Sequence, residues 1–151
     1  MDALGTVRSF GYSWQTTWGV PKTGPPATGT TASKLVVTAD HTALVTDLND
    51  IVFVKAVVAD SSGRVVTSSS APITFVVTGP GTIEAVDSAS MVQETFRGNV
   101  RNAYQGVAFA LVQANGPGMI TVTASASGLN GGTASIQASA GTFVPCSGTC
   151  D

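Results

Sequence analysis

The segment 79–113 constrains the fold of this chain more than any other part of the sequence. A Gly-Pro-Gly turn leads into the short apolar run 82–86, and a long polar loop then ends at Tyr104, just before the nearly apolar run 107–113. This order of turn, short strand, loop and second strand is typical of antiparallel β-structure. Because loops of such length are usually functional or packed against a neighbour, the loop is also a candidate site.

Strand-sized runs of apolar and β-branched residues recur along the chain, separated by turns rich in Gly, Asp, Asn and Ser. In the run 51–59, Val52, Val54 and Ala56 share one face and predict a core side, whereas Lys55 marks the other face as partly solvated. No run keeps the periodicity of a helix. The pattern predicts an all-β fold, an immunoglobulin-like antiparallel β-sandwich of about seven to nine strands. The runs that we predict as strands are 34–39, 43–45, 51–59, 64–67, 73–78, 82–86, 107–113, 119–125 and 133–138.

The composition excludes several classes of partner. Charged residues make up only 11% of the chain, and its seven Lys and Arg residues are scattered, so nucleic acid is not an expected partner. No run approaches the roughly 20 apolar residues of a membrane span, so no membrane partner is expected either. Few charges with abundant Ser and Thr resemble secreted β-domains, and from this we expect an extracellular protein. We expect no cofactor.

The chain divides into segments of different composition. Residues 1–20 form an aromatic extended segment, either the end of a preceding domain or an added strand, and 21–33 form a linker rich in Pro, Gly and Thr. The sandwich is expected over 34–140, and 141–151 form a tail that carries the cysteine pair. Since residues 1–10 lack the apolar core of a signal peptide, we expect that a signal has been removed or that the chain is a piece of a longer protein.

The aromatic residues of the first segment are candidate binding groups. Phe10, Tyr12 and Trp14 alternate, so they share one face of a strand, and Trp18 follows. Rings on one face could bind polysaccharide, but we favour a packed strand or an interface with a neighbouring domain. Self-association by strand exchange through this segment is a further alternative.

The two cysteines, Cys146 and Cys150, lie close together in the tail. We favour a disulfide that clasps the tail, with free or intermolecular thiols as the alternative, and a disulfide implies an oxidising compartment. A zinc site would need more ligands than this pair and the distant His41 provide. Calcium bound by loop aspartates such as Asp40 and Asp60 is a less favoured possibility, and no metal site is expected.

No catalytic constellation is visible in the sequence. The two glutamates are Glu84, within a predicted strand, and Glu94, within the long loop. Acid–base catalysis by two carboxyl groups needs both at a fixed spacing on a rigid frame, which this placement does not predict. Gly-x-Ser-x-Gly is also absent. We therefore expect that the chain is not an enzyme by itself.

Tyr104 begins a strand after a long loop, as the tyrosine corner of sandwich domains does. Its ring is expected in the core and its hydroxyl on a nearby backbone group, so that Tyr104→Phe would cost about 1 kcal/mol. Arg101 is expected to pair with Asp87 or Glu94 across the loop.

Several motifs together resemble one family. Leu-Val-Val-Thr-Ala-Asp at 35–40, Gly-Pro-Gly at 79–81 and Arg-Asn-Ala-Tyr-Gln-Gly at 101–106 resemble the immunoglobulin-like domain near the C-terminus of many family 2 glycoside hydrolases of β-galactosidase type. The resemblance covers roughly residues 34–138, and residues 87–96 depart from the family's pattern. It implies scaffold roles for Gly79, Gly81, Arg101, Tyr104 and Gly106.

The same resemblance implies a function. It indicates a non-catalytic accessory domain of a secreted family 2 glycosidase that serves carbohydrate degradation by packing on other domains or subunits. The alternative is a stand-alone extracellular module that binds carbohydrate, acts as an adhesin or builds a fibre.

Overall fold

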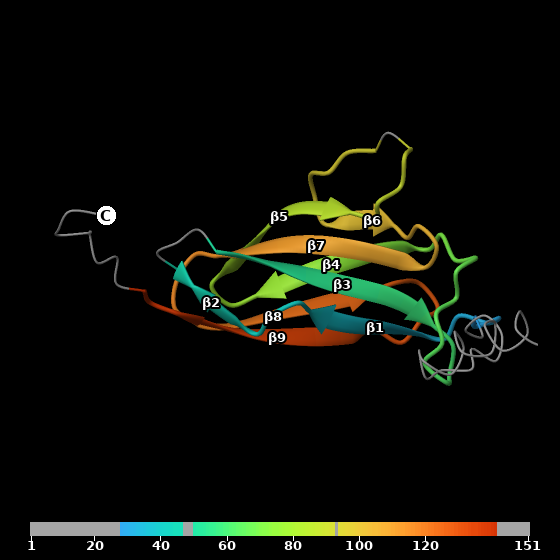
Figure 1. Cartoon of the computed structure of the whole chain (residues 1–151), viewed down its shortest axis with the longest axis horizontal. Helices are drawn as coiled ribbons and strands as arrows, with labels where there is room; N and C mark the ends of the chain where they lie inside the picture. Colours follow the sequence, from blue (N-terminus) through green and yellow to red (C-terminus); the bar gives the residue numbers. More distant parts are fainter. Residues whose placement is uncertain (1–27, 47–49, 93, 142–151) are drawn as a thin grey trace, which may run out of the picture.

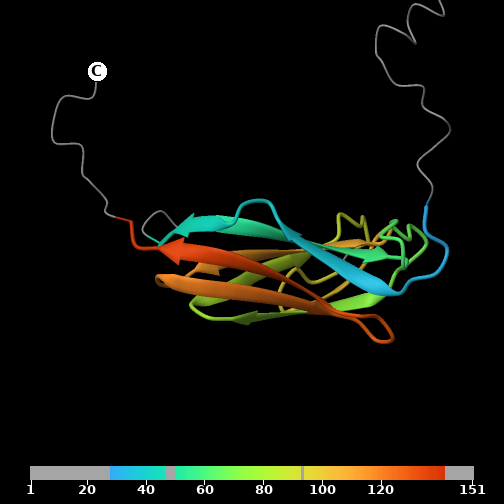
Figure 2. The ribbon, with the colours of Figure 1, turned by 90° about the horizontal axis from the view of Figure 1, so that it is seen from below.

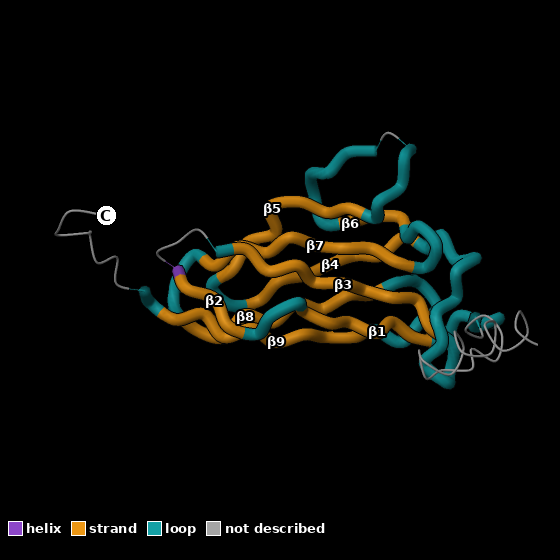
Figure 3. Tube along the Cα trace, viewed as in Figure 1, coloured by secondary structure: helices purple, strands orange, loops and turns teal. Residues whose placement is uncertain are grey.

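The computed structural model describes residues 28–46, 50–92 and 94–141, which form nine strands in two sheets. The sheets lie face to face as the layers of a sandwich (Figure 1, Figure 3). Among these residues no helix is long and apolar enough to cross a membrane. The predicted all-β sandwich is confirmed. The strands are β1 (Lys34–Ala39), β2 (Ala43–Val45), β3 (Ile51–Ala59), β4 (Pro72–Thr78), β5 (Gly81–Asp87), β6 (Val100–Asn102), β7 (Val107–Ala114), β8 (Gly118–Ser125) and β9 (Gly132–Ser139).

The first sheet has the strand order β1-β3-β7-β5, and the second sheet has the order β2-β9-β8-β4-β6. Neighbouring strands run antiparallel except β2, which pairs in parallel with β9. Because β1 belongs to the first sheet and β2 to the second, the chain crosses from one layer to the other beside β9 (Figure 2). A parallel bridge between Lys34 and Asn130 ties the start of β1 to the turn before β9.

The core lies between the inner faces of the two sheets. β3 buries every second residue, as its alternation predicts, and β4 and β8 do the same from the second sheet. Each fully buried side chain of this size contributes roughly 1.5–3 kcal/mol, so the alternation also holds the layers together. The buried side chains of these strands include Val52, Val54, Ala56, Val58, Ile73, Phe75, Ile120 and Val122.

Apart from shifts of one residue at the ends of β4, β5, β7, β8 and β9, the predicted and observed strands differ at two places. The run 64–67 forms no strand but a single bridge between Val65 and Ala59, because Asp60 Oδ1 accepts the amide of Arg64 at 2.9 Å and holds the chain in a turn. The loop that was expected to run unbroken from 87 to 103 contains the short strand β6. Before β1, the amide of Gly29 donates to the carbonyl of Val65 at 2.8 Å.

The family-motif glycines occupy positions where a side chain would not fit. Gly79 has a φ of 95° in the turn between β4 and β5, and the carbonyl oxygen of Met119 lies where a Cβ would be. Gly106 has a φ of 77° and meets the carbonyl oxygen of Val66 in the same way. At Gly81, a Cβ would come 2.9 Å from Cγ2 of Ile120. These contacts let the turns lie directly against neighbouring backbone and core.

Candidate interaction surface

The outer faces of the two sheets differ in polarity. On the second sheet, β8 and β9 present mainly hydroxyl and amide side chains, such as Thr121, Ser135 and Gln137, although Val76 and Met119 are also exposed there. On the first sheet the corresponding positions are mainly aliphatic and aromatic. We call this set the apolar face; it comprises Val36, Ile51, Phe53, Val57, Val107, Phe109 and Leu111.

Strand register brings these side chains together. Phe53 of β3 lies opposite Leu111 of β7. The next pair on the same face is Lys55 and Phe109, which places the Phe109 ring beside the Phe53 ring. Side chains directly opposite each other on one face of a sheet have Cβ atoms roughly 5 Å apart, so Phe53, Leu111 and Phe109 adjoin, and Lys55 lies among them. Phe53 is 49% exposed, which is high for a phenylalanine in the middle of a sheet.

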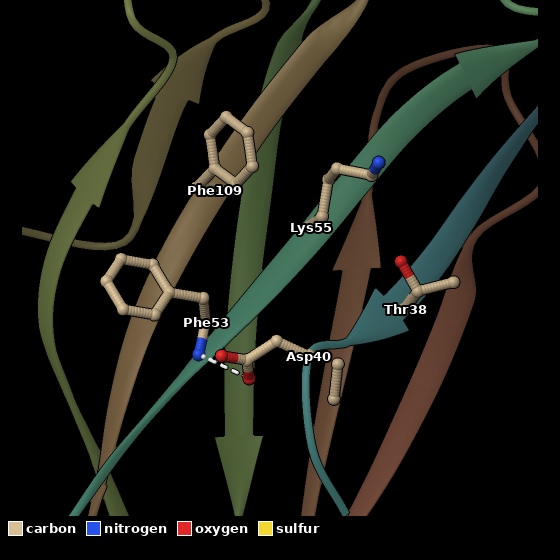
Figure 4. Close-up of a pocket in the computed structure, with 6 residues that line it drawn as sticks. Thr38, Asp40, Phe53, Lys55 and Phe109 are labelled. Carbon is tan, nitrogen blue, oxygen red and sulfur yellow. Dashed lines mark hydrogen bonds between the residues drawn. The ribbon is translucent and has the colours of Figure 1, made fainter.

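Two shallow hollows share Phe53 and Phe109. One, of about 190 Å³, is bordered by Thr38, Asp40 and Lys55 (Figure 4). The carboxylate of Asp40 is already engaged, because its Oδ1 accepts the amides of Phe53 at 3.1 Å and of His41 at 2.9 Å. The other hollow, of about 220 Å³, is lined by Phe53, Phe109, Leu111, Asp87 and Ala89. The second hollow therefore joins the apolar face to the loop that follows β5.

Arg101 of β6 is buried beneath that loop, with only 2% of its surface exposed. Its guanidinium lies 3.3 Å from Oδ1 of Asp87 and 3.4 Å from Oε2 of Glu94, so Arg101 pairs with both of the carboxylates that were alternatives in the sequence. It also donates to Ser88 Oγ and to the carbonyl of Thr95, each at 3.2 Å. A buried charge needs such a set of partners, and all of them come from the loop and its base.

Residues 88–92 and 94–99, which we call the 88–99 loop, project beyond β5 and β6 (Figure 1). Asp87 Oδ1 caps its first turn by accepting the amides of Ser88 at 2.6 Å and of Ala89 at 3.1 Å. Its returning arm is tied to the sheets, since the carbonyls of Phe96 and Asn99 accept the amides of Val86 and Phe75 at 2.8 and 2.7 Å. The tip is apolar, with Met91 100% exposed and Val92 66% exposed.

The predicted tyrosine corner is wrong in its main feature. Tyr104 is 46% exposed, so its ring does not pack in the core. Its amide and carbonyl pair with those of Val107 across a tight turn in which Gln105 and Gly106 both have positive φ. Strand alternation then points Ala103 inward and Tyr104 outward.

The candidate residues Glu84 and Glu94 do not lie on the apolar face. Glu84 is exposed on β5 where the register shifts, and Glu94 is paired with Arg101. The described ranges hold no group of three or more His, Cys, Asp or Glu side chains that could bind a metal ion. Phe10, Tyr12, Trp14, Trp18, Cys146 and Cys150 lie outside the described residues.

Sequence reasoning did not single out the apolar face. Lys55 indicates a partly solvated side of the run 51–59, and Ile51, Phe53 and Val57 lie on that same side. The sequence did contain an indication in the run 107–113, which is apolar on both faces. A strand of that kind is usually covered on both sides.

Comparison with known proteins agrees with the motifs. The model of the glycoside hydrolase family 2 C-terminal domain 5 matches residues 35–135. The Beta-galactosidase BoGH2A of Bacteroides ovatus is 31% identical over 99 residues, which cover 64% of this chain and 12% of that protein. The chain thus spans only a small part of its relative.

Solved structures show the same relationship. A glycosyl hydrolase family 2 member from Bacteroides cellulosilyticus superposes with a TM-score of 0.70 at 28% identity, over 74% of this chain and 15% of that one. A beta-glycosidase from Bacteroides vulgatus shares the fold with a TM-score of 0.68 at 15% identity, over 72% of this chain and 14% of that one. Since the family model spans most of the sandwich, this chain belongs to the glycoside hydrolase family 2 C-terminal domain 5 family.

Proposed function

We propose that this chain is a non-catalytic accessory domain of a family 2 glycosidase, and that it packs through the apolar face on another domain or subunit of that enzyme. The polarity difference between the two outer faces carries this proposal. Contiguous exposed apolar patches mark interaction sites, whereas single exposed apolar residues need no explanation.

The surroundings of the apolar face fit a protein partner. Thr38 and Asp40 lie at one border and Asp87 at another, while Lys55 lies within the face, opposite Phe109. This arrangement resembles the anatomy of protein interfaces, in which an apolar core is enclosed by a polar rim. The matched region forms only 12% of the related β-galactosidase, so most of such an enzyme is available as a partner.

We propose no catalytic role because the two glutamates of the chain, Glu84 and Glu94, are not placed as a catalytic pair. Glu94 forms an ion pair with Arg101, and its Oε1 accepts a hydrogen bond from Asn102 Nδ2 at 3.2 Å. Both contacts attach the loop to β6. Glu84 is exposed at the register shift of β5. In the proposed enzyme, acid–base chemistry therefore belongs to another domain.

The test compares two aspartate substitutions in the natural polypeptide that contains this chain. Phe53→Asp places a charge on the apolar face, and Val76→Asp places one at a similarly exposed position, 49% against 46%, on the second sheet. We expect Phe53→Asp alone to separate the thermal unfolding of this domain from that of its neighbour in calorimetry. Equal behaviour of the two variants, or a reading frame without a glycosidase domain or partner subunit, would contradict the proposal.

A stand-alone carbohydrate-binding module is the second candidate. The rings of Phe53 and Phe109 lie on one surface beside Lys55 and Thr38, and exposed rings can stack on sugars (Figure 4). This function predicts that the chain alone is retained on insoluble polysaccharide and that Phe53→Ala with Phe109→Ala abolishes retention. The accessory-domain function predicts no retention of the chain alone.

We also propose that the protein is extracellular and that Cys146 and Cys150 form a disulfide there. The low charge and the richness in Ser and Thr support this location. Fractionation with an antibody against the chain tests it, and recovery in the cytosolic fraction with both thiols alkylatable would refute it.

A further inference from the structure

We infer that the 88–99 loop is a pre-organised second contact of the proposed interface, and that its tip, Met91 and Val92, is seated in an apolar pocket of a neighbouring domain of the same glycosidase. This inference rests on the proposed function. It adds a specific recognition element to the broad contact made by the apolar face.

The tip is the most exposed apolar element on the described surface. Met91 is fully exposed and Val92 is 66% exposed. Methionine is flexible and polarizable, and it is frequent at binding surfaces because it adapts to irregular pockets. A side chain of this kind at the end of a projecting loop fits insertion into a partner better than contact with solvent.

The charges of the loop are turned away from the tip. Asp87 at the end of β5 and Glu94 within the loop both face the buried guanidinium of Arg101. Arg97 remains as an exposed cation on the returning arm. The tip itself therefore presents an uncharged surface, which matches an apolar pocket on a protein and gives no anchor for a polyanion.

Both arms of the loop are tied to the domain in the absence of a partner. Arg101 holds Ser88, Thr95 and the two carboxylates, and its Cζ lies 5.2 Å from the centre of the Phe96 ring. Further along, the amide of Val92 donates to Ser90 Oγ at 3.2 Å. Ordering a loop in advance lowers the entropic cost of association, which is the physical advantage of a buried arginine at this place.

The loop and the apolar face form a continuous surface. Ala89, two residues before the tip, lines the same hollow as Phe53, Phe109 and Leu111. A domain that covers the apolar face would therefore also reach the base of the loop. Because the inference rests on the proposed function, the neighbouring domain that covers the apolar face is also the occupant at the loop.

The test uses photo-crosslinking in the natural full-length polypeptide that contains this chain. The photoreactive residue p-benzoylphenylalanine replaces Met91, Phe53 or Met119 in separate preparations, and linked peptides are identified by mass spectrometry. Met119 is the matched control, since it is also an exposed methionine, 54% exposed, but lies on the outer face of the second sheet. We expect positions 91 and 53 to link to the same neighbouring domain and position 119 to link to it far less.

The outcomes separate this inference from the proposed function. Links from 53 without links from 91, or links from 91 only to a second copy of the chain, would leave the proposed function standing and overturn the inference. No links from either position, or a polypeptide without another domain, would overturn both. Equal yields from all three positions would also overturn both.

A second variant tests the role of Arg101 in the loop. Arg101→Lys keeps the charge but cannot supply the several directed N–H groups of a guanidinium. We expect links from position 91 to be lost or redistributed in this background while links from 53 persist. Unchanged links from 91 would show that Arg101 does not pre-organise the tip.

Discussion

Arg101 Nη2 lies 3.3 Å from Oδ1 of Asp87, and the same oxygen accepts the backbone amides of Ser88 and Ala89. One carboxylate oxygen therefore joins the buried guanidinium to the first turn of the 88–99 loop. The start of the loop is therefore attached to the buried part of the domain through Asp87 and Arg101.

The first prediction concerns this guanidinium. Arg101→Met should lower the free energy of unfolding by about 3 kcal/mol, because it leaves Asp87, Glu94 and buried polar groups without their partner. Arg97→Met, an exposed change on the same loop, should alter it by less than about 0.5 kcal/mol. Urea denaturation measures both, and equal effects would show that Arg101 is not a structural centre.

The second prediction compares two phenylalanines on opposite sides of the sandwich. Phe75 is fully buried and Phe53 is 49% exposed. Phe75→Ala should cost about 3–5 kcal/mol, since it removes contacts and leaves a cavity. Phe53→Ala in the isolated chain should cost less than about 1 kcal/mol. A large loss at Phe53 in thermal or urea unfolding would mean that its ring already packs within the chain.

A third prediction separates backbone conformation from steric fit. Gly63 and Gly106 have φ values of 85° and 77°, but only Gly106 has a backbone carbonyl, that of Val66, where a Cβ would lie. Gly63→Ala should cost about 1 kcal/mol, the penalty of the left-handed conformation alone. Gly106→Ala should cost clearly more, and similar melting temperatures of the two variants would contradict this assignment.

The fourth prediction replaces the one made for Tyr104 from sequence. Because the ring is 46% exposed, Tyr104→Phe should change the free energy of unfolding by less than about 0.5 kcal/mol, not by 1 kcal/mol. Calorimetry of the two proteins measures the difference, and a loss near 1 kcal/mol would restore the tyrosine corner.

Strands with strong alternation could be predicted from the sequence. The bounds of β1, β2 and β3 agree with prediction, since turn residues flank each run and alternate side chains divide cleanly between core and surface. β6 could not be predicted, because its central residue is Arg101 and a charged side chain ordinarily indicates a solvated position. Its burial depends on Asp87 and Glu94, which only the tertiary structure brings to it.

The candidate surface was harder to predict than the fold. Which outer face is apolar depends on how β1, β3 and β7 are ordered in the sheet, and that order is set by pairing between distant segments. Tyr104 illustrates the same limit, since a two-residue turn at Gln105 and Gly106 decides which side of the strand the ring occupies. The ion pairs of Arg101 were predictable, because few charged residues compete for it in this chain.

The parallel pairing of β2 with β9 has a mechanical consequence. The coloured ribbon begins and finishes at opposite ends of the long axis, and β2 runs beside β9 in the same direction (Figure 2). Tension applied between these ends would slide the two strands past each other, so their hydrogen bonds would be strained together rather than unzipped one by one. Because forced unfolding is governed by the unfolding rate, we expect a shear clamp that opens slowly in single-molecule stretching, and an easily extended domain would contradict it.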